Sequence, residues 1–136
     1  MFKLTTVKNT RDNRDRTKVS TVAATTGFLY KNNLTSGAFE ATAAATTSGE
    51  VLYMANETQT AADAKTVVNC TVVFESDEFL VDVVNNSNSA HNGQRMILNS
   101  TGDKLNNTGT DSTTGVFAQV DVVGASTAKQ ILARKI

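Results

Sequence analysis

The chain of 136 residues contains no proline, no tryptophan, one cysteine and one histidine. The single cysteine, Cys70, cannot form an intramolecular disulfide, so we expect it to be buried as a small apolar side chain. One histidine and one cysteine cannot supply the nitrogen and sulfur ligands, usually about four, of a zinc site. Because proline is absent, every backbone N–H remains available to a β-ladder, and strands can pair without interruption.

Sequence motifs of catalysis and ligand binding are absent as well. No glycine-rich phosphate-binding motif occurs, and the acidic residues at positions 77–82 lack the ligand spacing of a calcium-binding loop. His91 lies in a polar segment with Ser87, and a Ser-His-Asp arrangement with Asp82 can be imagined, but neither a nucleophile elbow nor an oxyanion loop accompanies it. We therefore predict that the protein is not an enzyme and uses no cofactor or metal.

The chain also lacks a long apolar segment. No run approaches the roughly 20 residues needed to cross a bilayer, and the N-terminal residues have neither the apolar core nor the cleavage site of a secretory signal. We expect the protein to fold where it is made, without membrane contact, and its Asn-x-Ser/Thr triplets to stay unglycosylated.

Threonine and asparagine are abundant instead. The chain contains 21 threonines and 13 asparagines, a quarter of all residues, which favour β-strand surfaces and turns, respectively. Apolar residues make up 40% and charged residues 19% of the chain. This length and composition fit one domain with a modest core, or two very small β modules that support each other or lean on a partner. The weakly charged surface favours self-association.

Charge is distributed unevenly, although it sums to zero. Residues 1–18 contain six basic and two acidic residues, whereas residues 40–84 contain eight acidic residues and one basic residue. This texture predicts an extended basic N-terminal arm over residues 1–18, ordered by a partner, followed by a β-rich domain over residues 19–136. The opposite charges of the two regions can attract each other between neighbouring subunits, or each region can dock on a partner surface of opposite charge. The alternative is that each charged side chain is simply solvated. Because the arm lacks interleaved aromatic residues, we expect no sequence-specific nucleic-acid binding.

Short β-prone segments separated by turn residues predict an all-β domain, either a small β-sandwich or barrel-like. At residues 66–84, two β-branched runs flank the acidic turn 75–78 and predict a hairpin with strands buried on two faces. Residues 38–49 are predicted to be a strand or loop, residues 59–65 a single helical turn, and residues 85–93 a loop. The remaining predicted strands are residues 19–24, 28–30, 49–57, 95–99, 115–124 and 130–136, the last with a short helix capped by Ser126 as its alternative.

Several segments, taken in order along the chain, carry a family resemblance. The basic N-terminus is followed by residues 49–55 (GEVLYMA), by the valine-rich region 66–84, by residues 91–98 (HNGQRMIL), and by residues 114–120 (TGVFAQV) with 131–134 (ILAR). This order and composition resemble the small capsid decoration, or cement, proteins of tailed bacteriophages. The resemblance covers most of the chain.

The resemblance implies a β-rich virion protein on the outer surface of an icosahedral capsid, made in the host cytoplasm and often trimeric. Such a protein binds neighbouring subunits of the major capsid protein and stabilises their contacts against the pressure of packed DNA, with several weak contacts made strong by multivalency. Within this hypothesis the anchors lie in the N-terminal arm: Phe2 and Leu4 as apolar contacts, and Arg11, Arg14 and Arg16 as charge contacts. Without a partner, the same residues form a flexible, solubilising tail.

Two other classes of function stay open. A phage tail, fibre or surface-adhesion component shares the Thr- and Asn-rich β composition, and long trimers or glycan binding would favour it. A small enzyme or binding module built on the His91 loop is the third interpretation. It predicts that His91→Ala abolishes an activity while the fold persists.

Overall fold

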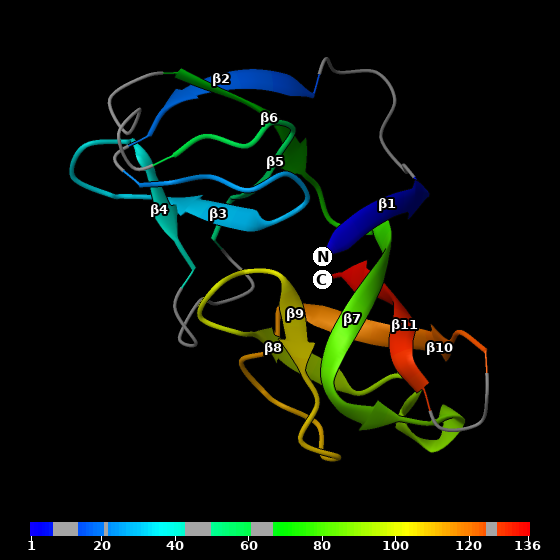
Figure 1. Ribbon diagram of the computed structural model, residues 1–136. Coiled ribbons are helices and arrows are strands. Elements are labelled where there is room, and N and C mark those ends of the chain that lie inside the picture. The colour runs from blue at the N-terminus through cyan, green and yellow to red at the C-terminus, as the bar shows by residue number, and fades with distance from the viewer. Residues whose placement is uncertain (7–13, 21, 43–49, 61–66, 125–127) are drawn as a thin grey trace.

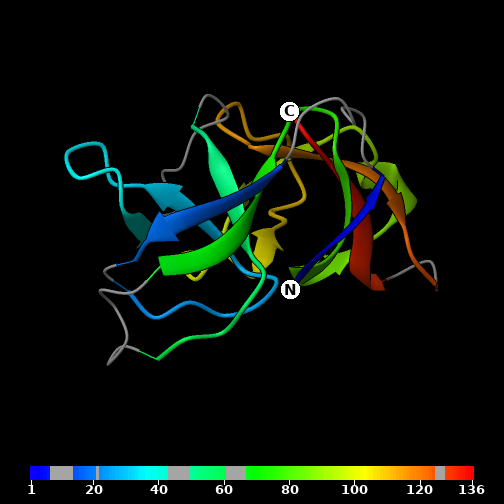
Figure 2. The same ribbon diagram turned by 90° about the horizontal axis from the view of Figure 1, so that it is seen from above.

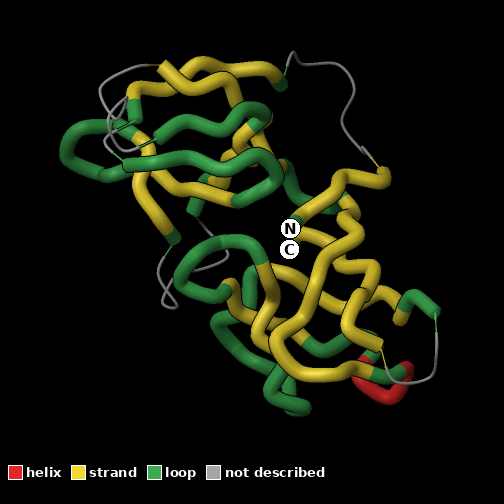
Figure 3. Tube along the Cα trace, in the orientation of Figure 1, coloured by secondary structure: helices red, strands yellow, loops and turns green. Residues whose placement is uncertain are grey.

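The computed structural model describes residues 1–6, 14–20, 22–42, 50–60, 67–124 and 128–136. It confirms the all-β prediction, because these residues form two β-sheets and one short 3₁₀ turn, η2 (Ser89–His91) (Figure 3). The sheets lie side by side (Figure 1, Figure 2). One sheet holds most strands from the first half of the chain, and the other holds β1 and the strands of the second half.

One sheet closes into a five-stranded barrel. Its strands are β7 (Glu78–Ser87), β8 (Arg95–Leu98), β9 (Lys104–Asn106), β10 (Phe117–Val122) and β11 (Ala128–Lys135). They are ordered β7-β11-β10-β8-β9, and β9 returns to β7 through parallel pairing of Asp82 with Lys104 and Val83 with Leu105. A further strand, β1 (Phe2–Thr6), pairs antiparallel with the first part of β7.

Alternation along the strands directs apolar side chains into the barrel. On β7, Phe79, Val81 and Val83 are buried, while the residues between them are partly exposed. Three aromatic rings meet in this core. The ring centroids lie 5.6 Å apart for Phe2 and Phe79, 5.2 Å for Phe2 and Phe117, and 5.8 Å for Phe79 and Phe117. The first strand therefore contributes one of the largest side chains of the barrel core.

The second sheet has the order β2-β6-β5-β3-β4, and all of its pairings are antiparallel. Its strands are β2 (Asp15–Val19), β3 (Leu29–Asn32), β4 (Phe39–Ala41), β5 (Leu52–Ala55) and β6 (Val67–Val73). The sheet has an apolar cluster of its own, in which Tyr30 stacks on Phe39 with 5.1 Å between ring centroids. Cys70 is fully buried in this cluster, as predicted.

The two sheets are joined by a shared core and by close backbone contact. Leu29, Leu52 and Val73 of the second sheet pack into the barrel cluster. The Leu29 N–H donates to the Gly102 carbonyl at 2.8 Å. Gly102 has φ +76°, and a Cβ at this position would lie 2.2 Å from the Leu29 carbonyl oxygen, so only glycine permits the approach. The sheets consequently form one packed unit.

The hairpin predicted over residues 66–84 is wrong. β6 pairs with β2 and β5, whereas β7 pairs with β1, β9 and β11. The turn between them is bonded to β11, because the Ser76 N–H donates to Lys135 O at 2.8 Å and the Lys135 N–H donates to Asp77 O at 2.9 Å. Because the turn is bonded to β11, the chain passes from the second sheet into the barrel sheet at this point. Burial also alternates along much of both strands instead of covering two faces.

The structure describes residues 1–6 and 14–18 of the arm predicted over residues 1–18, and these residues do not form a separate arm. Residues 2–6 form β1 of the barrel sheet, and residues 15–19 form β2 of the second sheet. The proposed domain boundary between residues 18 and 19 falls inside β2. Burying a phenylalanine contributes roughly 1.5–3 kcal/mol, which explains why Phe2 draws the first strand into the core despite its polar surroundings in sequence. Residues 7–13 lie outside the described part.

Most other predicted strands are present. β5, β8 and β10 lie within their predicted ranges, and β11 begins slightly earlier than predicted. β4 falls within residues 38–49, and β7 continues to Ser87, beyond the start of the predicted loop. The strand predicted over residues 19–24 is wrong beyond Val19, the last residue of β2. Among the described residues that follow, Ser20 and Ala24 form only isolated β-bridges. Residues 43–49 and 61–65 lie outside the described part of the chain.

Candidate functional site

The predicted N-terminal anchors are mostly committed to the protein's own fold. Phe2 is 2% exposed in the barrel cluster, and Leu4 is partly buried against the same cluster. These two side chains serve the internal core, which corrects their assignment as apolar anchors. Arg16 is exposed, and its Nη1 donates to the Asp15 carbonyl at 2.9 Å. Arg11 lies outside the described residues.

Arg14 is also used internally. Its Nη1 donates to Asp77 Oδ2 at 2.6 Å and its Nη2 donates to Asp77 Oδ1 at 2.9 Å, with side-chain exposures of 9% and 0%. The guanidinium lies 4.6 Å from the ring centroid of Phe74, and Asp77 Oδ2 also accepts the Phe74 N–H. Arg14 therefore ties the start of β2 to the turn between β6 and β7, and its assignment as a charge anchor is corrected.

His91 lies beside a buried polar network. Its Nδ1 is 3.2 Å from Ser87 Oγ and 3.3 Å from Asn107 Nδ2. Ser87 Oγ donates to Gln119 Oε1 at 2.5 Å, and the Gln119 amide nitrogen donates to the loop that carries His91. Because the Ser87 proton points to Gln119 and Ser87 is fully buried, Ser87 and His91 do not have the arrangement of a nucleophile and its base.

Asp82, the imagined third member of that triad, lies elsewhere. Its carboxylate accepts from the N-terminal amine of Met1 at 3.2 Å and from Gln130 Nε2 at 2.9 Å. Burial acts to raise the pKa of Asp82, but these two hydrogen bonds, together with the positive charges of the N-terminal amine and Lys104, hold the pKa below its ordinary value. No contact between the described residues joins Asp82 to His91.

The turn at residues 33–38, between β3 and β4, presents Leu34 to solvent with 93% exposure. Asn33 organises this turn: its side-chain oxygen accepts two backbone N–H groups of the turn at 2.9 and 3.0 Å, and its backbone pairs with residues 37 and 38. Its Nδ2 donates to Glu40 at 3.0 Å. The sequence signal was available, because Leu34 stands between two turn-forming pairs at positions 32–33 and 36–37.

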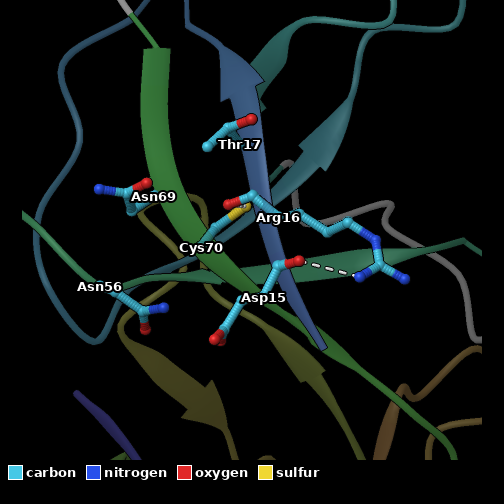
Figure 4. A pocket seen from close by; sticks show the side chains of 6 residues that line it. All are labelled: Asp15, Arg16, Thr17, Asn56, Asn69 and Cys70. Carbon is cyan, nitrogen blue, oxygen red and sulfur yellow. Dashed lines mark hydrogen bonds between the residues drawn. The ribbon is translucent and has the colours of Figure 1, made fainter. Parts of the chain in front are cut away.

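A pocket of about 360 Å³ opens on the face of β2 and β6 (Figure 4). We call it the β2–β6 pocket, and its lining residues are Asp15, Arg16, Thr17, Asn56, Asn69 and Cys70. Burial raises the pKa of the Cys70 thiol to about 11, although the positive charges of Lys18 and Arg16 act in the opposite direction. The thiol is thus protonated at neutral pH and is a poor nucleophile or metal ligand.

The described residues contain no group of three or more histidine, cysteine or acidic side chains that could hold a metal ion. No helix among them has the length and hydrophobicity to cross a membrane. Comparisons of the chain with protein-family models, with curated proteins and with solved structures gave no match.

Proposed function

We propose that the protein is a structural component of a tailed-phage virion, which binds the outer surface of the icosahedral capsid and stabilises contacts between major capsid protein subunits. The order and composition of the sequence segments support this proposal through their resemblance to capsid decoration proteins. The oligomer in this proposal is a homotrimer, whose repeated contacts add up through multivalency.

The observation that carries a docking role is Leu34 on its ordered turn. A single exposed leucine is common on protein surfaces. This one is 93% exposed on a turn whose backbone is ordered by the Asn33 hydrogen bonds, so little backbone freedom remains to be lost when a partner covers it. Burying a leucine side chain against a partner contributes roughly 1.5–3 kcal/mol.

The burial of Arg14 against Asp77 supports a narrower basic contact than the sequence suggested. Arg14 is neutralised by Asp77, whereas Lys3 and Arg16 are exposed. We therefore assign the charged part of the contact to Arg16, and the apolar part to Leu34 in place of Phe2 and Leu4.

A phage tail, fibre or surface-adhesion component is the second candidate. The β2–β6 pocket favours it, because a concave site of about 360 Å³ suits a small ligand better than it suits a flat protein contact.

The test is co-sedimentation of the purified protein with capsids of the encoding phage that lack it, together with the temperature at which the particles release DNA. We expect the protein to bind the capsids and to raise the release temperature. Leu34→Asp should weaken binding by roughly tenfold or more, since it would place a carboxylate in an apolar contact without a partner.

The matched control is Thr113→Asp, which places the same charge on another exposed turn and should bind normally. Failure of the unaltered protein to sediment with capsids would overturn the proposal. Equal binding by Leu34→Asp and Thr113→Asp would remove Leu34 from the contact.

A further inference from the structure

We propose that the β2–β6 pocket binds a neutral saccharide. The proposal goes beyond capsid attachment and does not depend on it. Arg16 lines the pocket and also belongs to the proposed capsid contact, but the side chains assigned to the sugar are those of Asp15, Thr17, Asn56 and Asn69.

Antiparallel pairing places the polar side chains on one face. Asp15 is opposite Thr71, and Thr17 is opposite Asn69, so the side chains of each pair point to the same side of the sheet. Asn56 joins them from the end of β5, where its N–H donates to Asn69 O at 2.9 Å. In Figure 4 the Asp15 carboxylate turns toward the side of Asn56, while the Arg16 guanidinium extends away from both.

The two amides of the pocket are oriented by neighbouring side chains. Glu57 accepts from the Asn69 N–H at 3.0 Å and from Asn69 Nδ2 at 3.1 Å, which fixes which end of the amide is oxygen. Thr71 Oγ1 lies 2.9 Å from Asn56 Nδ2 and 3.3 Å from Asn56 Oδ1. Each amide retains bonding capacity beyond these contacts, since an amide side chain can make up to about four hydrogen bonds. Because these donors and acceptors are already oriented, a ligand that bonds to them loses less conformational freedom on binding.

The chemistry of the lining selects the class of ligand. The amide, hydroxyl and carboxylate groups of the lining together offer hydrogen-bond donors and acceptors. The hydroxyl groups of a saccharide also act as both donors and acceptors, so they can pair with these groups. Arg16 is the one cationic residue among the described residues of the lining, but its guanidinium extends away from the Asp15 carboxylate (Figure 4), so Asp15 and the nearby Glu57 disfavour a phosphate beside the amides. An apolar ligand would leave the polar groups unpaired, at a cost in affinity.

An apolar strip continues the same face. Val19 and Val67 are directly opposite each other, two positions further along than Thr17 and Asn69, and residues two apart in a strand share a face. Both valines are 52% exposed. A pyranose ring presents hydroxyl edges and a face of C–H groups, so its edge can bond to the pocket while its C–H face covers the valines.

The size of the pocket fits this class of ligand. Small-molecule sites measure roughly 300–1,000 Å³, and the β2–β6 pocket, at about 360 Å³, lies at the lower end of that range. A monosaccharide unit or the terminal unit of a longer glycan is the expected occupant.

The test is a titration of the isotope-labelled protein, followed by amide chemical shifts, with four neutral disaccharides as probes: lactose, maltose, cellobiose and chitobiose. We expect at least one probe at millimolar concentration to shift amides of residues 15–19, 56–57 and 67–71 and not those of the barrel. Thr17→Val keeps the β-branched shape but removes the hydroxyl, and it should weaken this binding by roughly tenfold. Inorganic phosphate, the competing anionic probe, should cause no such shifts.

Thr113→Val is the matched control and should bind as the unaltered protein does. The proposal is overturned if none of the four probes shifts these amides, if phosphate shifts them instead, or if Thr17→Val binds as tightly as Thr113→Val. Capsid co-sedimentation is measured without sugar, so failure here and failure of the capsid proposal give separate readings.

Discussion

Arg14 and Asp77 form a buried, two-bonded ion pair between residues 63 positions apart in the chain. The pair connects the first residue before β2 with the turn that leads from the second sheet into the barrel. Planar guanidinium and carboxylate groups bond well in this geometry, and removing one partner leaves a buried charge without compensation.

We expect Asp77→Asn to lower the free energy of unfolding by roughly 3–5 kcal/mol, because Arg14 then remains buried without its counter-charge. Urea denaturation measures the change. Glu78→Gln is the control: Glu78 is 13% exposed but its partner Arg134 is 47% exposed, so solvent screens this pair more than the Arg14–Asp77 pair and its loss should cost less. Similar losses for the two variants would contradict the structural role of the buried pair.

Gly102→Ala should be strongly destabilising, by roughly 3 kcal/mol or more, since it combines an unfavourable φ with a collision against the Leu29 carbonyl that joins the two sheets. Gly109→Ala is closely matched, because Gly109 has φ +78° but no atom within 4 Å of the added Cβ. It should cost only about 1–2 kcal/mol. Thermal unfolding of both variants checks the difference, and equal losses would show that the close approach does not matter.

Cys70 should react slowly with thiol reagents at neutral pH. Burial raises its pKa from 9.0 to about 11, which reduces the thiolate fraction roughly hundredfold. The unfolded chain releases the thiol proton at a lower pH than the folded protein, so stability is complete below pH 9 and falls as the pH rises from 9 toward 11. Unfolding free energies of the protein and of Cys70→Ala across this window give the test. If both lose stability identically there, the thiol does not titrate as described.

Asp111 should titrate well below an ordinary aspartate. Arg95 donates to its carboxylate through Nε at 3.0 Å and through Nη2 at 2.5 Å, and its backbone N–H donates at 2.8 Å, which together lower the pKa of Asp111 to about 2. The stabilisation is present above pH 3.8 and is lost as the pH falls toward 2. A carbon-detected NMR titration measures this pKa directly. Arg95→Gln should move it back toward 3.8, and no movement would rule out the side-chain contribution.

Local sequence patterns predicted much of the secondary structure. Turn-forming residues and β-branched runs report on conformations that depend on neighbours along the chain, and β5, β8, β10 and β11 were found where these patterns placed them. The burial of Cys70 followed from the apolar run around it. The hairpin prediction for residues 66–84 was wrong because a tight turn between two apolar runs looks the same in sequence whether the two strands pair with each other or enter different sheets.

The candidate site was less predictable. Leu34 lies between two recognisable turn pairs, and its exposure could have been inferred from them. Asp15, Thr17 and Asn69 gave no signal in sequence, because they meet only through the register of β2 on β6. Phe2 was assigned to an arm on the strength of the charges that follow it, whereas its ring is one of three that form the barrel core.

The sequence by itself determined that this protein is built from short strands and turns, since a quarter of its residues are threonine or asparagine and none is proline. The tertiary structure alone decided which strands pair, where the chain changes sheets, and whether the basic N-terminal residues face solvent or the core. The physical reason is that pairing, burial and charge compensation depend on contacts between distant residues, such as Arg14 with Asp77 and Thr17 with Asn69, which no local pattern records.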